Sequence, residues 1–333
     1  MSKADPCPKS AVSHGVGVAG LVGLAVWTLV ARHYGMNGPN AGLAAVVACG
    51  VPMVLWSLIV DKVHRHASTG IDWAAPPRPL RAVLDTSIVK IAGLWATWLA
   101  IAIFYCIARW YWSGNYRFSM DLFLNAAPWL LAASVPYILW IDRRLIEPRD
   151  ATYSFGQWVI GGAAGAPDMS EVANHARAWA VKGFFLAFMI SIVPGNFASV
   201  VEWRISDAVA HPVALAGFLI AVMFMVDVCM ATVGYILTFK PLDSHIRTAN
   251  PYLGGWLAAL ICYPPFVLMG KGGPLDYHAG GAEWDVWTQG STVLQWLLGG
   301  WLVLLTAVYA WATVAFGIRF SNLTHRGILT HGP

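Results

Sequence analysis

The sequence has very little charge. Charged residues make up 11% of its 333 residues, whereas soluble domains carry about 25%. Hydrophobic residues make up 58%, and the mean hydropathy is +0.59. Because so few charges cannot cover a surface that faces water, the composition excludes a soluble globular protein. It predicts a chain whose apolar side chains face lipid.

Motifs for several kinds of chemistry are also missing. The five cysteines form no CxxC pair, and the ten histidines form no HExxH motif, so no metal site is expected. The sequence contains no Walker loop, GxSxG or GxGxxG motif, which leaves hydrolase and nucleotide-driven functions without support. The net charge of +4 is too small to indicate a nucleic-acid partner.

Long apolar runs are what the sequence does contain. A helix needs roughly 20 apolar residues to cross a bilayer. The runs predict an all-α transmembrane bundle of about eight spans, at 16–31, 41–60, 88–108, 122–141, 184–201, 213–239, 253–269 and 292–316. The 18 Trp and 11 Tyr residues suit anchoring in the headgroup layer, so membrane lipids are expected partners. Residues 1–317 are predicted to form one membrane domain.

Basic residues fall unevenly on the two sides of this predicted bundle. All but five of the 21 Lys and Arg residues lie in the two tails and in the second, fourth and sixth connections, if Lys90, which flanks the second connection, is counted with it. The five exceptions are Arg32, Arg109, Arg117, Arg204 and Lys271. By the positive-inside rule, both termini are predicted to be cytoplasmic, in a multi-pass protein of the inner membrane of a bacterium.

Two polar features, one in a predicted connection and one in a predicted span, suggest specific contacts. In the long connection at 142–182, Asp168 or Ser170 is predicted to cap a short interfacial helix at 171–181, separate from the next span. Asp227 lies near the middle of the sixth span, where a charge is costly unless it is paired or faces a polar cavity. Two interpretations of Asp227 stay open: a proton or substrate site, and a polar clamp to a neighbouring helix.

The tail after the last span is polar and contains glycine turns. From Arg319 to Pro333 it reads Arg-Phe-Ser-Asn-Leu-Thr-His-Arg-Gly-Ile-Leu-Thr-His-Gly-Pro. This string resembles the approach to the cofactor-binding motif of the isoprenylcysteine carboxyl methyltransferase family and its bacterial relatives. In that family the string continues with Tyr-Arg and then Arg-His-Pro-x-Tyr, and this second part is not in the sequence. The resemblance covers Arg319–Pro333 alone.

The resemblance implies S-adenosylmethionine as methyl donor, bound on the cytoplasmic side. It implies an amphiphilic acceptor from the membrane, a lipid-linked or isoprenylated carboxylate or amine. Asn322, Arg326, Gly332 and Pro333 are the residues it assigns to the cofactor, so residues 318–333 are expected to begin a cofactor-binding segment. Since the rest of that motif is missing, this chain alone is expected to be inactive and not to bind the cofactor measurably.

Three alternatives remain at this point. A membrane sterol-type reductase with a nicotinamide cofactor shares a similar C-terminal segment, and the residues that follow Pro333 in the gene would distinguish it. A transporter would use Asp227 and the run at 253–269, which Pro264 and Pro265 interrupt. A scaffold without catalysis is the third.

Overall fold

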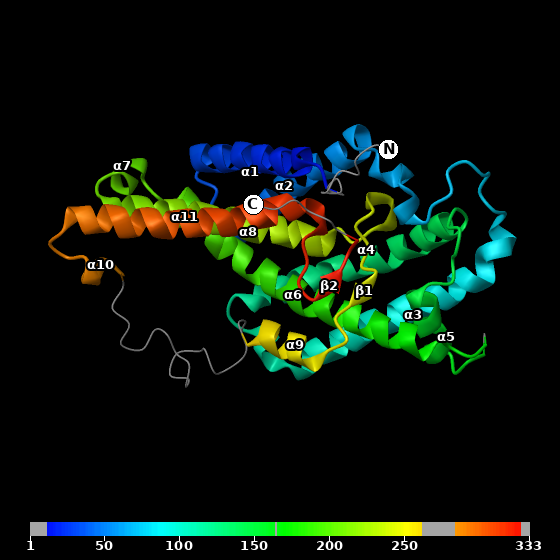
Figure 1. Cartoon of the computed structure of the whole chain (residues 1–333). Helices are drawn as coiled ribbons and strands as arrows, with labels where there is room; N and C mark the ends of the chain where they lie inside the picture. The colour runs from blue at the N-terminus through cyan, green and yellow to red at the C-terminus, as the bar shows by residue number, and fades with distance from the viewer. Residues whose placement is uncertain (1–11, 164, 262–283, 328–333) are drawn as a thin grey trace, which may run out of the picture.

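The structure is a computed structural model that describes residues 12–163, 165–261 and 284–327, and α-helices dominate it (Figure 1). Seven of its helical segments are long and apolar enough to cross a membrane. They are α1 His14–Tyr34, α2 Pro39–Leu55 with its π-helical extension Trp56–Val60, α3 Leu80–Ile107, α4 Tyr116–Asp142, α6 Met169–Val201, α8 Pro212–Ile236 and α11 Thr292–Phe316. The prediction of an all-α, multi-pass membrane bundle is confirmed.

Short elements join these helices. They are α5 Ala151–Val159, α7 Ile205–Ala208, α9 Leu253–Leu260, α10 Trp284–Trp287, and a two-stranded antiparallel ribbon of β1 Thr248–Ala249 and β2 Thr324–His325. The expected span at 253–269 is described only as far as residue 261, where it forms the eight-residue helix α9. The remainder of that run lies outside the described residues.

The helices α8 and α11 lie side by side and run in the same direction (Figure 1). Ala216 lies against Gly299 near their first turns, and Gly234 lies against Phe320 at the other end. The chain therefore returns from one end of the bundle to the other between Ile236 and Thr292. This return puts Gly317 beside Val12 and Val16, next to the start of α1. The start of α1 and the end of α11 therefore lie at the same side of the bundle.

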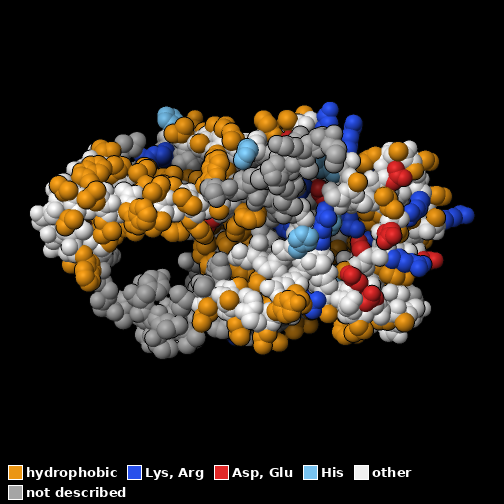
Figure 2. Space-filling view, viewed as in Figure 1, with side chains coloured by type: hydrophobic (Ala, Val, Ile, Leu, Met, Phe, Trp, Pro, Cys, Tyr) orange, Lys and Arg blue, Asp and Glu red, His pale blue; other side chains and the backbone are white. Residues whose placement is uncertain are grey.

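Charged side chains gather at that same side. We call it the basic end: it carries the connections 61–79, 142–168 and 237–252 and the segment 317–327. Figure 2 shows most Lys, Arg, Asp and Glu side chains there, and mainly hydrophobic side chains over the rest of this face. At the opposite end, Arg32 donates hydrogen bonds to the carbonyl oxygens of Val200 and Trp203, at 2.7 and 2.8 Å. Arg32 therefore lies at the end of the bundle away from the basic end, as predicted.

The helix α6 differs from the prediction. The sequence suggested a short helix at 171–181 and a separate span from 184, but a single helix of 33 residues covers both. Asp168 is its N-cap and accepts hydrogen bonds from the backbone N–H groups of Ser170 and Glu171, so the predicted cap is confirmed. Within this helix, the Gly183 carbonyl accepts a 2.6 Å hydrogen bond from Tyr105 Oη of α3.

Glycines set the closest helix contacts. A Cβ atom at Gly23 of α1 would lie 2.0 Å from the carbonyl oxygen of Ala48 on α2. A Cβ atom at Gly156 of α5 would lie 2.1 Å from the carbonyl oxygen of Val89, and Gly93 lies directly against Gly156. Small residues are what allow backbones to approach this closely in lipid. Because Gly93 and Gly156 lack side chains, α5 packs directly against α3. The connection 142–168, which contains α5, is therefore held against the bundle.

The positive-inside rule predicts that the basic end is cytoplasmic, and single cysteines test this prediction. In a background without native cysteines, we expect His33→Cys, at the opposite end, to react with a membrane-impermeant maleimide in intact cells. Arg65→Cys, at the basic end, is expected to react only after the cells are permeabilised. Labelling of both variants in detergent is the control. If only Arg65→Cys reacted in intact cells, the basic end would face the outside of the cell, and the predicted orientation would be wrong.

Candidate functional site

The segment after α11 folds back over the basic end. A 3-10 turn, Gly317–Arg319, follows the helix, and β2 then pairs with β1, so that Thr248 faces His325. The backbone N–H of Asn322 donates a 3.0 Å hydrogen bond to Tyr235 Oη of α8. The part of the tail that carries the family-like string is thus attached to α8 and to the connection that follows it.

Arg326 is the main anchor of this segment. Its guanidinium donates to the carbonyl oxygens of Ser244, Phe320, Gly234 and Leu237, at 2.7 to 3.0 Å. The last two carbonyls belong to the C-terminal end of α8, where a helix has unpaired acceptors and a partial negative charge. The residue is 2% exposed. Burial, and then the Arg319 guanidinium, lower the pKa of Arg326 to about 9, which leaves it protonated at neutral pH.

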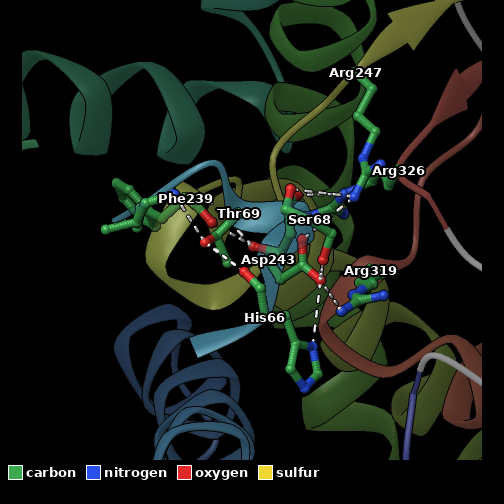
Figure 3. A network of polar contacts seen from close by, with 10 residues as sticks. His66, Ser68, Thr69, Phe239, Asp243, Arg247, Arg319 and Arg326 are labelled. Carbon is green, nitrogen blue, oxygen red and sulfur yellow. Dashed lines mark hydrogen bonds and ion pairs between the residues drawn. The ribbon is translucent and has the colours of Figure 1, made fainter. Parts of the chain in front are cut away.

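Asp243 is the second anchor, and Figure 3 shows the side chains that converge on it. Its carboxylate accepts hydrogen bonds from Arg319 at 2.9 Å, from Ser68 at 2.6 Å and, more weakly, from Arg247 at 3.4 Å. His66 Nδ1 lies 3.7 Å away. Both Asp243 and Arg319 are 3% exposed. This one carboxylate therefore ties the turn at 66–69, the connection after α8 and the start of the tail together.

A second ionic cluster lies beside the first. Lys90 of α3 donates to Asp142 at 2.7 Å and to Asp150 at 3.1 Å, and Lys240 donates to Asp150 at 3.0 Å. Asp150 also caps α5 through the backbone N–H of Tyr153. Burial alone would raise the pKa of Asp150, but the ammonium groups of Lys90 and Lys240 outweigh it and hold that pKa well below its usual range.

Cations and unpaired polar atoms are in excess around the first cluster. Lys182 of α6 donates to the Thr238 hydroxyl at 2.5 Å and has no carboxylate partner among the described residues. Four of the buried polar atoms that lack a hydrogen-bond partner within the described structure lie at the basic end: His64 Nδ1, Arg177 Nε, His245 Nδ1 and Arg247 Nε. Burial, and then Lys240 and Arg247, lower the pKa of His245 to about 4, so it is neutral at pH 7. Such a surface suits an anionic group.

The residues that the resemblance pointed to are distributed as follows. Asn322 and Arg326 lie in the docked segment, and Gly332 and Pro333 lie outside the described residues. The Arg326 guanidinium donates hydrogen bonds to four backbone carbonyls. Its side chain therefore points into the protein and orients the segment. Sequence reasoning missed Asp243 and its contact with Arg319. The only signal was the polar stretch Lys240–Arg247 directly after a long apolar run.

Asp227 lies apart from this site, inside the bundle. Its carboxylate accepts hydrogen bonds from Tyr309 Oη, at 2.9 Å, and from the Thr313 hydroxyl, both on α11. It is 4% exposed. Because both carboxylate oxygens already have partners on a neighbouring helix, this geometry supports the clamp interpretation over a substrate pathway. Among the described residues, no group of three or more His, Cys, Asp or Glu side chains is arranged to hold a metal ion.

The depressed pKa of Asp150 has a consequence for stability. A carboxylate whose pKa is lower in the folded state stabilises the fold above its unfolded pKa of about 3.9, and loses that contribution as the pH falls below it. We expect Asp150→Asn to lower the free energy of unfolding at pH 7 by about 1–3 kcal/mol. The difference from wild type should shrink below about pH 4. Thermal unfolding in detergent across this pH range measures it, and a difference that is constant with pH would contradict the assignment.

Arg326 provides a test of the anchor. Lysine keeps the charge but has one nitrogen, which cannot bridge four carbonyls. We expect Arg326→Lys to destabilise the fold by about 2–5 kcal/mol and to speed hydrogen exchange in residues 318–327. The exposed Arg81→Lys, at the same end, is the matched control and should leave both unchanged. Wild-type exchange in the Arg326 variant would show that the segment is held by other contacts.

Comparisons with known proteins add nothing to this picture. No protein-family model, curated protein or solved structure matches the chain. The function has to be argued from the docked tail and the polar clusters of the basic end.

Proposed function

We propose that this chain is the membrane domain of an S-adenosylmethionine-dependent methyltransferase in the inner membrane of a bacterium. The acceptor would be a lipid-linked or isoprenylated carboxylate or amine. The observation that carries the proposal is the tail: Arg319–Gly327 contains most of the string that resembles the methyltransferase family, and it is fixed to the basic end by Arg319 and Arg326. A cofactor loop that follows such a segment would start from a rigid platform.

The residues around the tail are compatible with this cofactor. Arg247 has a buried Nε without a hydrogen-bond partner in the described structure, and its guanidinium lies against Gly327, from which the chain continues. An arginine in this state suits the carboxylate of the cofactor's methionine part. Arg326 and Asn322 would orient the loop. When bound, S-adenosylmethionine supplies an activated methyl group on its sulfonium.

The protein's own contribution would be positioning and exclusion of water. Methyl transfer is an in-line displacement, so its rate depends on holding donor and acceptor in one geometry. The basic end meets the lipid-facing helices, so the apolar part of an amphiphilic acceptor can stay in the membrane while its polar group approaches the tail. Asp243 would act at a distance, by fixing Arg319 and Arg247.

A methyl-transfer assay tests the proposal. We would express the whole reading frame that encodes this chain, including whatever follows codon 333, in bacterial membranes. Supplied with S-adenosylmethionine labelled in the methyl group, these membranes are expected to transfer label to the lipid-extractable fraction. Asp243→Asn should reduce the transfer about tenfold or more, because it releases the tail, while Arg81→Lys should match wild type.

Two results would overturn the proposal. One is a folded wild-type protein that transfers no label to any extractable lipid. The other is consumption of a reduced nicotinamide cofactor by the same membranes, with no methyl transfer, which would favour the reductase alternative.

A further inference from the structure

The start of α3 and the end of α4 lie side by side at the basic end. The Ser87 hydroxyl of α3 donates a 2.9 Å hydrogen bond to Asp142 of α4, and Trp95 Nε1 donates one of 3.0 Å to the Ser134 hydroxyl. The connection 61–79, which leads into α3, contacts the residues that follow α4. We call the surface formed there the α3–α4 corner; its side chains are Trp73, Arg78, Trp140, Arg143 and Arg144.

The corner lies where the exposed side chains change from apolar to charged. Trp140 is exposed in the last turn of α4, and Arg143 and Arg144 follow directly after that helix. Further along the two helices, the exposed side chains include Leu99 of α3 and Leu131 of α4. An exposed tryptophan beside cations, at the end of an apolar helix, is typical of the level of the lipid headgroups. The corner is therefore within reach of a phospholipid headgroup.

Backbone hydrogen bonds hold the two halves of the corner together. The N–H of Asp72 donates to the carbonyl of Arg144 at 2.8 Å, and the N–H of Arg78 donates to the carbonyl of Arg143 at 2.9 Å. Arg143 Nε donates back to the carbonyl of Arg78 at 2.7 Å. Because these contacts already fix the connection against the end of α4, a ligand would not have to order it.

Arg144 is held over an aromatic ring. Its guanidinium carbon lies 5.0 Å from the centre of the Trp73 ring. Trp73 is itself fixed, since its Nε1 donates a 2.6 Å hydrogen bond to the carbonyl of His64. The ring of Trp140 lies beside it, with the centroids 6.2 Å apart. A guanidinium that stacks on an indole keeps its N–H donors in its own plane, where an anion can accept from two of them.

The corner has a surplus of positive charge. Arg78, Arg143 and Arg144 form no ion pair with a carboxylate of the described residues. Arg78 donates one side-chain hydrogen bond, to a backbone carbonyl at 3.0 Å. Of the acidic residues in these segments, Asp72 accepts hydrogen bonds from the backbone of the turn that follows it, and Glu147 is exposed. Arginines in this state suit a phosphate, which can accept paired hydrogen bonds from a guanidinium.

We propose that the α3–α4 corner binds an anionic phospholipid of the leaflet at the basic end. Its phosphate would accept hydrogen bonds from Arg144 and Arg78, and Trp140 would pack against its glycerol backbone. Its acyl chains would follow the exposed apolar side chains of α3 and α4. Basic residues directly beside the end of a span are typical of sites for anionic lipids, whereas a zwitterionic lipid brings an ammonium group that the arginines repel. The site does not depend on the proposed methyl transfer, so either proposal can fail alone.

Native mass spectrometry of the purified whole chain tests the site. Phosphatidylglycerol, phosphatidylethanolamine and phosphatidylcholine with identical acyl chains would be titrated in detergent micelles. We expect phosphatidylglycerol to bind about tenfold more tightly than either zwitterionic lipid. Arg144→Gln and Arg78→Gln should each weaken phosphatidylglycerol binding about fivefold, because each removes one cation from the headgroup level.

A matched control lies after the other end of the same helix. Arg109→Gln removes the same charge from an exposed arginine just beyond α3 and should leave lipid binding unchanged. Since Arg144 forms no ion pair in the described structure, Arg144→Gln should keep the thermal stability of the wild type. Equal binding of the three lipids, wild-type binding by both corner variants, or an equal loss with Arg109→Gln would overturn the proposal. Binding of free glycerol phosphate as tight as that of the lipid would also overturn it, since the membrane part would then be irrelevant.

Discussion

Arg326 donates hydrogen bonds to the backbone carbonyls at the C-terminal end of α8, and the rest of the basic end depends on this contact. In a membrane protein the carbonyls at a helix end must find donors inside the protein wherever water is scarce. One guanidinium meets this need for Gly234 and Leu237 and, with its other hydrogen bonds, holds Ser244 and Phe320. The same side chain therefore completes a helix and fixes the position of the tail. Since Ser244 and Phe320 directly follow Asp243 and Arg319, the contacts of Arg326 also hold these two side chains near each other.

Separation of charge along the bundle gives each end its own chemistry. At the basic end, carboxylates and ammonium groups pair closely, as in the contact between Lys90 and Asp142, and a surplus of cations remains. At the opposite end, Arg32 instead donates its hydrogen bonds to backbone carbonyls, those of Val200 and Trp203. The apolar bundle between the two ends keeps them apart.

The sequence predicts the spans well because lipid imposes a long and uniform apolar pattern on each of them. It predicts the helix ends less well. The sequence predicts Lys90 as a charge at the edge of a span, but α3 begins at Leu80, and Lys90 lies inside it, paired with Asp142 and Asp150. The clamp at Asp227 was one of two open interpretations, and only the positions of Tyr309 and Thr313 favour it.

The candidate site was harder to predict for a related reason. Arg319 and Asp243 are 76 positions apart, and no local spacing connects them. Arg326 was singled out through a family-like string, but the string says nothing about its carbonyl partners. Those partners depend on where α8 ends and on how the tail turns at Gly327, whose backbone has a φ of +69°. Such contacts follow from the tertiary fold.

The parallel arrangement of α8 and α11 bears on how the protein is made. Asp227 is synthesised 82 positions before Tyr309 and 86 before Thr313. At about 5–20 residues per second, the ribosome needs on the order of 4–17 seconds to supply these partners. Until then the helix must enter the bilayer with an unpartnered carboxyl group, which costs about 2.5–3.5 kcal/mol at its centre. The insertion machinery therefore has to retain α8, or tolerate it in lipid, until α11 emerges.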